Sequence, residues 1–156
     1  MKCGAGGVVE QRDRRIWRVG RARGPDDRRD ARVAYPTGYP STKSVRLWKV
    51  AAGKMTSVTV ATGSAEKTQT AIAADTKGRL WVVWAQHAPG RDRVYVRRSN
   101  TGAPAFGPAR YYVVPNGYQS VYHLAAAVRS GKLDVVAHLG WTKGEATWHI
   151  QFKPPA

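Results

Sequence analysis

The sequence predicts an all-β fold, and three observations carry that prediction. The large side chains of this 156-residue chain come mainly from six Trp and seven Tyr. Leu, Ile and Phe are scarce, so a core has to be built from Val, Ala and aromatic residues, a mixture that favours strands. Short apolar stretches alternate with turn-like segments, and a pattern of about fifty residues recurs along the chain. A chain of this length has room for one domain.

Residues 1–40 differ from the rest and are predicted to be a disordered, arginine-rich arm. They hold nine of the seventeen arginines but a single lysine, and they show no sustained apolar period. Such a segment buries too little apolar surface to order itself. The arm is interpreted as a nucleic-acid-binding segment, a flexible tail, or sequence foreign to the domain. Tyr35–Pro40 is turn-rich and marks a boundary, so the predicted domain is 41–156.

The domain is predicted to begin with a hairpin and a loop. Ser44–Val50 and Met55–Ala61 are strand-like, and the four residues between them resemble a hairpin turn. Thr62–Thr68 is polar and is predicted to be a loop.

The next segment is predicted to hold a tight turn and a central strand. A strand at Thr70–Ala74 leads into the turn Asp75–Gly78, where glycine accommodates a positive φ. Arg79–Gln86 is almost continuously apolar, which is typical of a strand covered on both faces.

Two further strands follow. His87–Asp92 is predicted to be a loop, Arg93–Ser99 an alternating strand, Asn100–Pro104 a turn and Phe106–Val114 a returning strand. The alternation places successive side chains on opposite faces. One face of Arg93–Ser99 carries Val94, Val96 and Arg98, and the other carries Tyr95 and Arg97.

A shift of 53 residues reveals an internal repeat. It aligns Ala73, Ala74, Gly78, Leu80, Val82 and Val83 with Ala126, Ala127, Gly131, Leu133, Val135 and Val136. The second unit spans about Tyr122–Lys153 and stops after its third strand, while Ser44–Ala61 resembles the last two strands of a preceding unit. About fifty residues and four strands per unit is the spacing of propeller blades. We therefore expect a partial β-propeller of about two to three four-stranded antiparallel blades.

The segments DTKGRLWVVWAQ and RVYVRRSNTGAPAF resemble a blade of the sialidase-like, Asp-box (BNR-repeat) propellers. The resemblance covers about residues 44–153. The family's turn reads Ser-x-Asp-x-Gly-x-x-Trp; here Ser99 and Phe106 occupy the serine and aromatic positions. Thr101 replaces the aspartate, Ala103 replaces the glycine, and Gly102 stands one position early. The resemblance implies a structural role for the turn residues Asp75, Gly78, Ser99, Gly102 and Phe106.

The resemblance does not extend to catalytic residues. Sialidases use an arginine triad, an acidic proton donor and a Tyr/Glu pair, and none of these can be placed in this chain. The acids after residue 40 show no spacing that suggests paired carboxylates. These acids are Glu66, Asp75, Asp92, Asp134 and Glu145. No catalytic residue is assigned; an enzyme, if this were one, would be a sialidase-like glycoside hydrolase.

The resemblance also implies a ligand-binding face formed by loops. It would comprise Thr62–Thr68, His87–Asp92, Pro115–Ser120 and Gly140–Glu145. Aromatic, arginine and amide side chains suit sugar stacking and hydroxyl recognition, and they equally suit ordinary loop packing. The candidate ligand-binding residues are His87, Arg91, Tyr118, Gln119, Trp141 and Lys143.

The net charge of +16 predicts attraction to polyanions. Arg97 and Arg98, with Arg91 and Arg93 nearby, form the densest basic cluster of the domain, and Tyr95, Tyr111 and Tyr112 would add base stacking. No recognised nucleic-acid-binding signature accompanies them. The four histidines lack metal-site spacing and Cys3 is the single cysteine, so neither a metal site nor a cofactor is predicted.

The predicted function is a non-catalytic binding or scaffold module, directed at carbohydrate. The alternatives are a nucleic-acid binder using the arm, and an inactive fragment of an exo-sialidase-like hydrolase. About 115 residues do not close a ring of about 4 to 8 blades, so we expect a fragment with missing blades, self-association, or a small sandwich. No apolar run reaches the roughly 20 residues of a membrane span. No signal peptide is visible, although the resembled family is often secreted, and localisation stays open.

Overall fold

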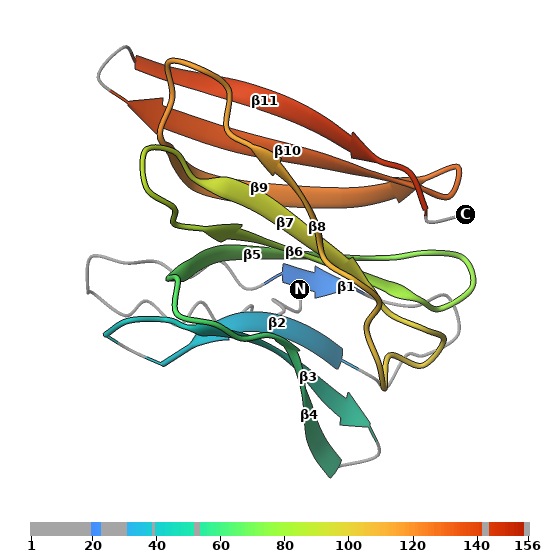
Figure 1. Ribbon diagram of the computed structural model, residues 1–156. Helices are drawn as coiled ribbons and strands as arrows, with labels where there is room; N and C mark the ends of the chain where they lie inside the picture. Colours follow the sequence, from blue (N-terminus) through green and yellow to red (C-terminus); the bar gives the residue numbers. More distant parts are fainter. Residues whose placement is uncertain (1–19, 23–30, 39, 52–53, 142–143, 155–156) are drawn as a thin grey trace, which may run out of the picture.

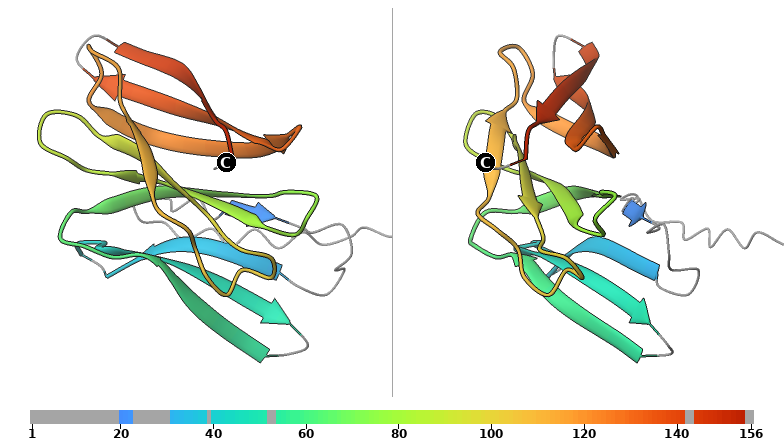
Figure 2. Two further views of the ribbon diagram at one scale, coloured as in Figure 1. Left: turned by 45° about the vertical axis from the view of Figure 1, so that its right-hand side comes forward. Right: turned by 90° about the vertical axis from the view of Figure 1, so that its right-hand side faces the viewer.

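The computed structural model describes residues 20–22, 31–38, 40–51, 54–141 and 144–154. These residues form eleven β-strands in three antiparallel sheets, and none of them is helical (Figure 1). Consequently, no membrane-spanning helix occurs in this part of the chain. The all-β prediction is confirmed. The three sheets pack one on another without closing (Figures 1 and 2).

The first sheet has the order β1-β2-β3-β4. Its strands are β1 (Gly20–Ala22), β2 (Ala31–Thr37), β3 (Ser44–Ala51) and β4 (Lys54–Ala61). The predicted hairpin is therefore confirmed as β3 and β4, which pair antiparallel.

The prediction of a disordered arm over 1–40 is wrong for β1 and β2. Composition did not reveal that β2 pairs with β3 along its whole length and buries Ala34 completely. Tertiary pairing supplies the stabilisation that the segment lacks by itself. The rest of the predicted arm, residues 1–19, 23–30 and 39, lies outside the described residues.

The middle sheet has the order β5-β6-β7-β8. Its strands are β5 (Lys67–Ala74), β6 (Leu80–Gln86), β7 (Arg93–Arg98) and β8 (Arg110–Val113). β5 begins three residues before the predicted start, so Lys67 belongs to a strand and not to the predicted loop. β8 is shorter than predicted, and Phe106 forms only an isolated bridge with Ser99.

The third sheet has the order β11-β10-β9. Its strands are β9 (Ser120–Arg129), β10 (Lys132–Trp141) and β11 (Gly144–Phe152). The three strands predicted for the second unit are therefore confirmed. Figures 1 and 2 show the middle sheet between the other two.

The middle sheet is covered on both faces, as predicted for its central strand. Trp81, Val83 and Ala85 of β6 pack in a core cluster shared with the third sheet. The alternate residues of β6, Val82 and Trp84 among them, pack in a cluster shared with the first sheet. Successive residues of β6 are buried on opposite faces because the side chains of a strand alternate with a period of two.

The turn between β5 and β6 and the turn between β9 and β10 differ in length, which corrects part of the predicted alignment of the repeat. Ala74 pairs with Leu80 across the five-residue Asp75 turn, whereas Arg129 pairs with Lys132 across Ser130 and Gly131. Both residues of the shorter turn have positive φ, the conformation of a type I′ hairpin. The change shifts the register by one residue: Ala73 pairs with Trp81, whereas Ala126 pairs with Val135, which the predicted alignment matched to Val82.

The predicted structural residues all contribute to turns. Gly78 has φ +70°, and its N–H donates to the Asp75 carbonyl at 3.0 Å. Ser99 Oγ accepts a 2.8 Å hydrogen bond from the N–H of Leu80. Gly102 has φ +79° in the turn before Phe106, which packs partly buried against the cluster between the first and middle sheets.

Candidate ligand-binding pocket

The four loops predicted to share a face are joined by backbone hydrogen bonds. The His87 N–H donates to the Glu66 carbonyl at 2.8 Å, linking the loop before β5 to the loop after β6. The Asp92 N–H donates to the Gln119 carbonyl at 2.8 Å, and Gln119 N–H donates to Gly140 at 3.4 Å. Loops of the middle and third sheets therefore lie side by side.

Asp92 links these loops through its side chain. It is 5% exposed, and its Oδ2 accepts a 3.0 Å hydrogen bond from the N–H of Val121. Its Oδ1 lies 3.0 Å from Nδ1 of His87, whose side chain is 69% exposed. The main role of this carboxylate is to hold β9 beside the loop before β7.

Most described candidates from the sequence serve loop packing. Arg91 Nη1 donates to the Val114 carbonyl at 3.0 Å and to the side chain of Asn116 at 2.5 Å. Tyr118 packs against the core between the middle and third sheets. Trp141 is described only as the last residue of β10, and Lys143 lies outside the described residues. Arg91 and Tyr118, whose side chains are described, therefore take part in loop packing.

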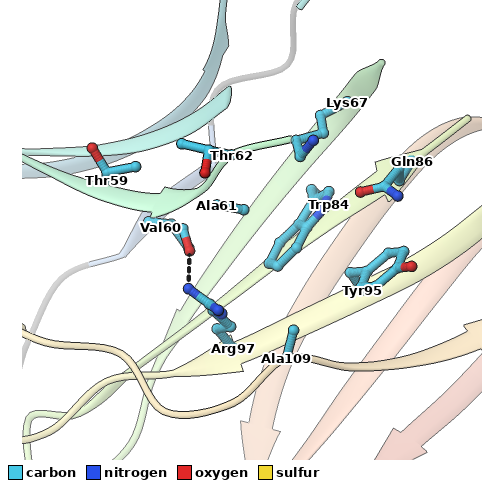
Figure 3. A pocket seen from close by; sticks show the side chains of 10 residues that line it. All are labelled: Thr59, Val60, Ala61, Thr62, Lys67, Trp84, Gln86, Tyr95, Arg97 and Ala109. Atoms are coloured by element: carbon cyan, nitrogen blue, oxygen red, sulfur yellow. Dashed lines mark hydrogen bonds between the residues drawn. The ribbon is translucent and has the colours of Figure 1, made fainter. Parts of the chain in front are cut away.

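A cavity of about 210 Å³ lies instead between the first and middle sheets (Figure 3). One wall is the end of β4, and the other is the face of β6 and β7 that looks toward the first sheet. Its ten lining residues are Thr59, Val60, Ala61, Thr62, Lys67, Trp84, Gln86, Tyr95, Arg97 and Ala109.

A β-bulge directs Lys67 into this cavity. Gln69 has φ +36° and no pairing partner, because the register of β5 and β6 shifts between Thr68 and Thr70. The extra residue reverses the side of the sheet to which the preceding side chains point. Lys67 therefore lies on the same face of β5 as Thr70. Thr42 fixes the position further: its carbonyl accepts from the Lys67 N–H, and its hydroxyl donates to the Lys67 carbonyl, both at 2.6 Å.

An aromatic ladder crosses the middle sheet at the cavity. Trp84 and Tyr95 are register partners whose rings stack at 5.4 Å with an interplanar angle of 10°. Tyr95 in turn pairs with Tyr111 of β8 at 5.0 Å. Tyr111 is 49% exposed, with the guanidinium of Arg93 5.1 Å from its ring centre. The ladder therefore runs from the buried cavity wall to the surface.

The cavity is rich in hydrogen-bond donors. Lys67 is 1% exposed and its Nζ donates to the Ala65 carbonyl at 2.9 Å. Burial lowers the pKa of Lys67 below its usual value. Arg97 Nη1 donates to the Val60 carbonyl at 2.6 Å, but Arg97 Nε and Trp84 Nε1 are buried without partners. An unpartnered buried donor costs about 1–3 kcal/mol.

The predicted arginine cluster is divided between the two faces of the middle sheet. Arg97 points to the first sheet, whereas Arg98 donates to Asp75 at 2.7 Å and lies 4.9 Å from the Trp81 ring. Tyr112 lies on the same face as Arg98, and the centre of its ring is 5.0 Å from the centre of the Phe152 ring. The residues proposed as one nucleic-acid clamp therefore do not share a surface.

Two of the described histidines lie beside carboxylates. His138 lies 3.1 Å from Glu145, and His149 lies 3.0 Å from Asp134, on the outer face of the third sheet. Within the described ranges, no three His, Cys, Asp or Glu side chains are grouped as metal ligands.

The sequence alone does not assign Lys67, Trp84 or Gln86 to a site. The period-two alternation of β6 could have identified Trp84 and Gln86, because it places both side chains on the same face of the strand. Trp84 pairs in register with Tyr95, so this is also the face of Tyr95. Lys67 gave no such signal, because its direction depends on the bulge.

Comparison with known proteins leaves the chain without an assigned family. No family model, curated protein or solved structure matches it. Any functional conclusion therefore depends on the geometry of the site.

Proposed function

We propose that this protein is a non-catalytic ligand-binding module directed at carbohydrate. In this proposal the three sheets correspond to blades of a sialidase-like propeller, and the ligand enters between the first two. The observation that carries the proposal is the aromatic ladder Trp84–Tyr95–Tyr111, which leads from the surface to a polar cavity.

The chemistry of the cavity suits one sugar residue. Aromatic rings offer flat apolar surface to the C–H face of a sugar, and hydroxyl and amide groups fix its orientation. Tyr111 supplies the exposed ring, while Gln86 and Thr62 border the cavity. A volume of about 210 Å³ is below the roughly 300–1,000 Å³ of pockets for drug-sized ligands. The site therefore fits a terminal residue better than the interior of a chain.

The lining also supports binding without turnover. Glycoside hydrolysis generally uses two carboxyl groups on either side of the bond that breaks. None of the ten lining residues is Asp, Glu or His. A sugar held here would meet no proton donor or nucleophile of that kind.

The test is a glycan array followed by calorimetry with matched variants. Tyr111 and Tyr112 are adjacent and almost equally exposed, at 49% and 47%, but lie on opposite faces of β8. We expect Tyr111→Ala to weaken binding of the selected glycan at least tenfold and Tyr112→Ala to change it less than twofold. Absence of any glycan binding, or equal losses in both variants, would reject the proposal.

Nucleic-acid binding is the second candidate, favoured by Arg93 stacked on the exposed Tyr111 and by the net charge of +16. Binding of a single-stranded oligonucleotide should then weaken steeply with salt, because counterion release dominates such complexes. Tyr111→Ala should weaken it further. A flat salt response would exclude this candidate.

A further inference from the structure

We propose that the outer face of the third sheet docks against the same face of a second copy of this chain and forms a weak antiparallel dimer. The outer face is the side of the third sheet that points away from the middle sheet. Figures 1 and 2 show the third sheet at the end of the stack, where none of the described strands covers this face. The inference goes beyond the proposed function and does not depend on a glycan.

The strand register arranges the outer face in rows that cross the three strands. Every second residue of a strand lies on this face, and the rings of His123 and His138 stack on it with their centres 5.7 Å apart. In the middle row, Val136 of β10 lies between Ala125 of β9 and His149 of β11. Val136 is 43% exposed, so the centre of the outer face is a small apolar surface open to solvent.

The corresponding face of the middle sheet is packed against another sheet. Val83 of β6 pairs with Ala71 of β5, and both side chains are buried in the core cluster that the middle sheet shares with the third sheet. Val136 and Ala125 form the same kind of pair one sheet further along the stack, but both are exposed. The pattern of the outer face therefore suits a β-sheet as its partner.

The charges at the two ends of the outer face favour a second copy with its strands in the opposite direction. Lys132 and Arg129 form a register pair at the hairpin end of β9 and β10, and both are exposed. Glu145 lies at the other end, with its side chain 68% exposed. A two-fold axis through Val136, perpendicular to the strands, brings the basic end of one copy onto the acidic end of the other.

The rows between the two ends contain no lysine or arginine. The rows on either side of Val136 hold Asp134, Ala127 and Gln151 on one side and His138, His123 and Thr147 on the other. The same two-fold axis places Asp134 of one copy opposite His138 of the other. The outer face also carries two of the five acids that follow residue 40. Because the chain has a net charge of +16, such a face is where two copies approach with the least repulsion.

The size of the outer face indicates the strength of the contact. Three strands about 4.8 Å apart, with ten residues of about 3.3 Å each, cover roughly 450 Å². Two copies together bury about 900 Å², below the roughly 1,200–2,000 Å² of stable complexes. We therefore expect a reversible dimer that forms at high protein concentration.

The test is sedimentation equilibrium of the full chain over a series of protein concentrations. Low ionic strength is used, because salt screens the charges at the two ends of the face. We expect a monomer–dimer equilibrium, since an isologous contact closes at two copies. A monomer at every concentration, or an open-ended series of larger species, overturns the proposal.

Two matched valine variants locate the contact. Val136 and Val113 are similarly exposed, at 43% and 40%, but Val113 lies on β8 of the middle sheet. Val136→Lys should weaken dimerisation at least tenfold, because it places two ammonium groups together at the two-fold axis. Val113→Lys adds the same charge elsewhere and should change dimerisation less than twofold. Equal effects of the two variants overturn the proposal.

An exchange of charges tests the direction of the strands. Glu145→Lys and Lys132→Glu should each weaken the dimer about threefold or more, because each places like charges opposite one another. The double variant should recover to within about twofold of the unmodified chain. Both positions are exposed, so this exchange decides the matter if Val136→Lys does not fold. A double variant that remains weakened overturns the antiparallel arrangement.

The outcome is independent of the carbohydrate proposal, because Tyr111 lies on the middle sheet and not on the outer face. Glycan binding by a chain that stays monomeric rejects only this inference. A dimer that loses affinity through Val136→Lys but binds no glycan rejects only the function proposed above.

Discussion

Arg98 donates a 2.7 Å hydrogen bond from Nη2 to Oδ2 of Asp75, joining the end of β7 to the turn between β5 and β6. The Asp75 side chain is 4% exposed and also accepts from the backbone and side chain of Arg79. Burial alone raises the pKa of Asp75, but the bonds from Arg98, Arg79 and Lys77 outweigh it and lower the pKa to about 2. The turn therefore depends on an ionised carboxylate.

Replacing Asp75 by Asn should destabilise the fold by about 2 kcal/mol at pH 7. This free energy follows from the difference between the folded-state pKa of about 2 and the ordinary value of 3.8. Because the folded-state pKa is lowered, this stabilisation is present above about pH 4 and is lost as the pH falls toward 2. Urea unfolding between pH 7 and pH 2 measures both effects. A variant with unchanged stability and an unchanged acid response would contradict the assignment.

Replacing Ser99 by Ala should lower the free energy of unfolding by about 1–3 kcal/mol. The change removes the acceptor of the Leu80 N–H, which Ser99 Oγ binds at 2.8 Å in a buried position. Ser57→Ala, at an exposed position on β4, is the control and should be close to neutral. Similar urea midpoints for the two variants would mean that the serine does not hold this turn.

Replacing Gly131 by Ala should destabilise the chain by about 1–2 kcal/mol through the backbone alone. Its φ is +75°, while an added Cβ would meet no atom within 4 Å. Gly107→Ala serves as the control, because Gly107 lacks a positive φ and its nearest contact would be an ordinary 3.6 Å. Thermal unfolding of both variants provides the comparison. Equal melting temperatures for the two variants would show that the positive φ at Gly131 does not affect stability.

Replacing Asp92 by Ala should destabilise the loop face by about 1–3 kcal/mol, because the change removes the acceptor of the buried Val121 N–H. His87→Ala should change stability by less than about 0.5 kcal/mol, since its side chain is mostly exposed. Hydrogen exchange at Val121 measures the local effect. Slow exchange retained at Val121 in Asp92→Ala would refute the linking role.

The middle sheet could be predicted from sequence because its signals are local. The apolar run of β6, the alternation of β7 and the glycine of the Asp75 turn each fix a conformation without reference to distant residues. The first sheet could not be predicted in full, because β2 is ordered by pairing with β3 and not by its own composition.

The candidate pocket depends on relationships that the sequence does not display. The bulge at Gln69 decides which face Lys67 joins, and the positive φ occurs at a residue other than glycine. The division of the arginine cluster did follow from alternation, but the partners of Arg97 and Arg98 come from segments 37 and 23 residues away. Such contacts arise only once the sheets pack.

The most direct test of the account is to follow the indole N–H signals of Trp84 and Trp148 while the glycan selected by the array is added. Trp84 borders the cavity between the first and middle sheets, and Trp148 packs against the third-sheet core. If the glycan enters this cavity, the Trp84 signal shifts and saturates while the Trp148 signal stays stationary. A shift of Trp148 with no change at Trp84 would place the ligand on another surface and contradict the proposed site.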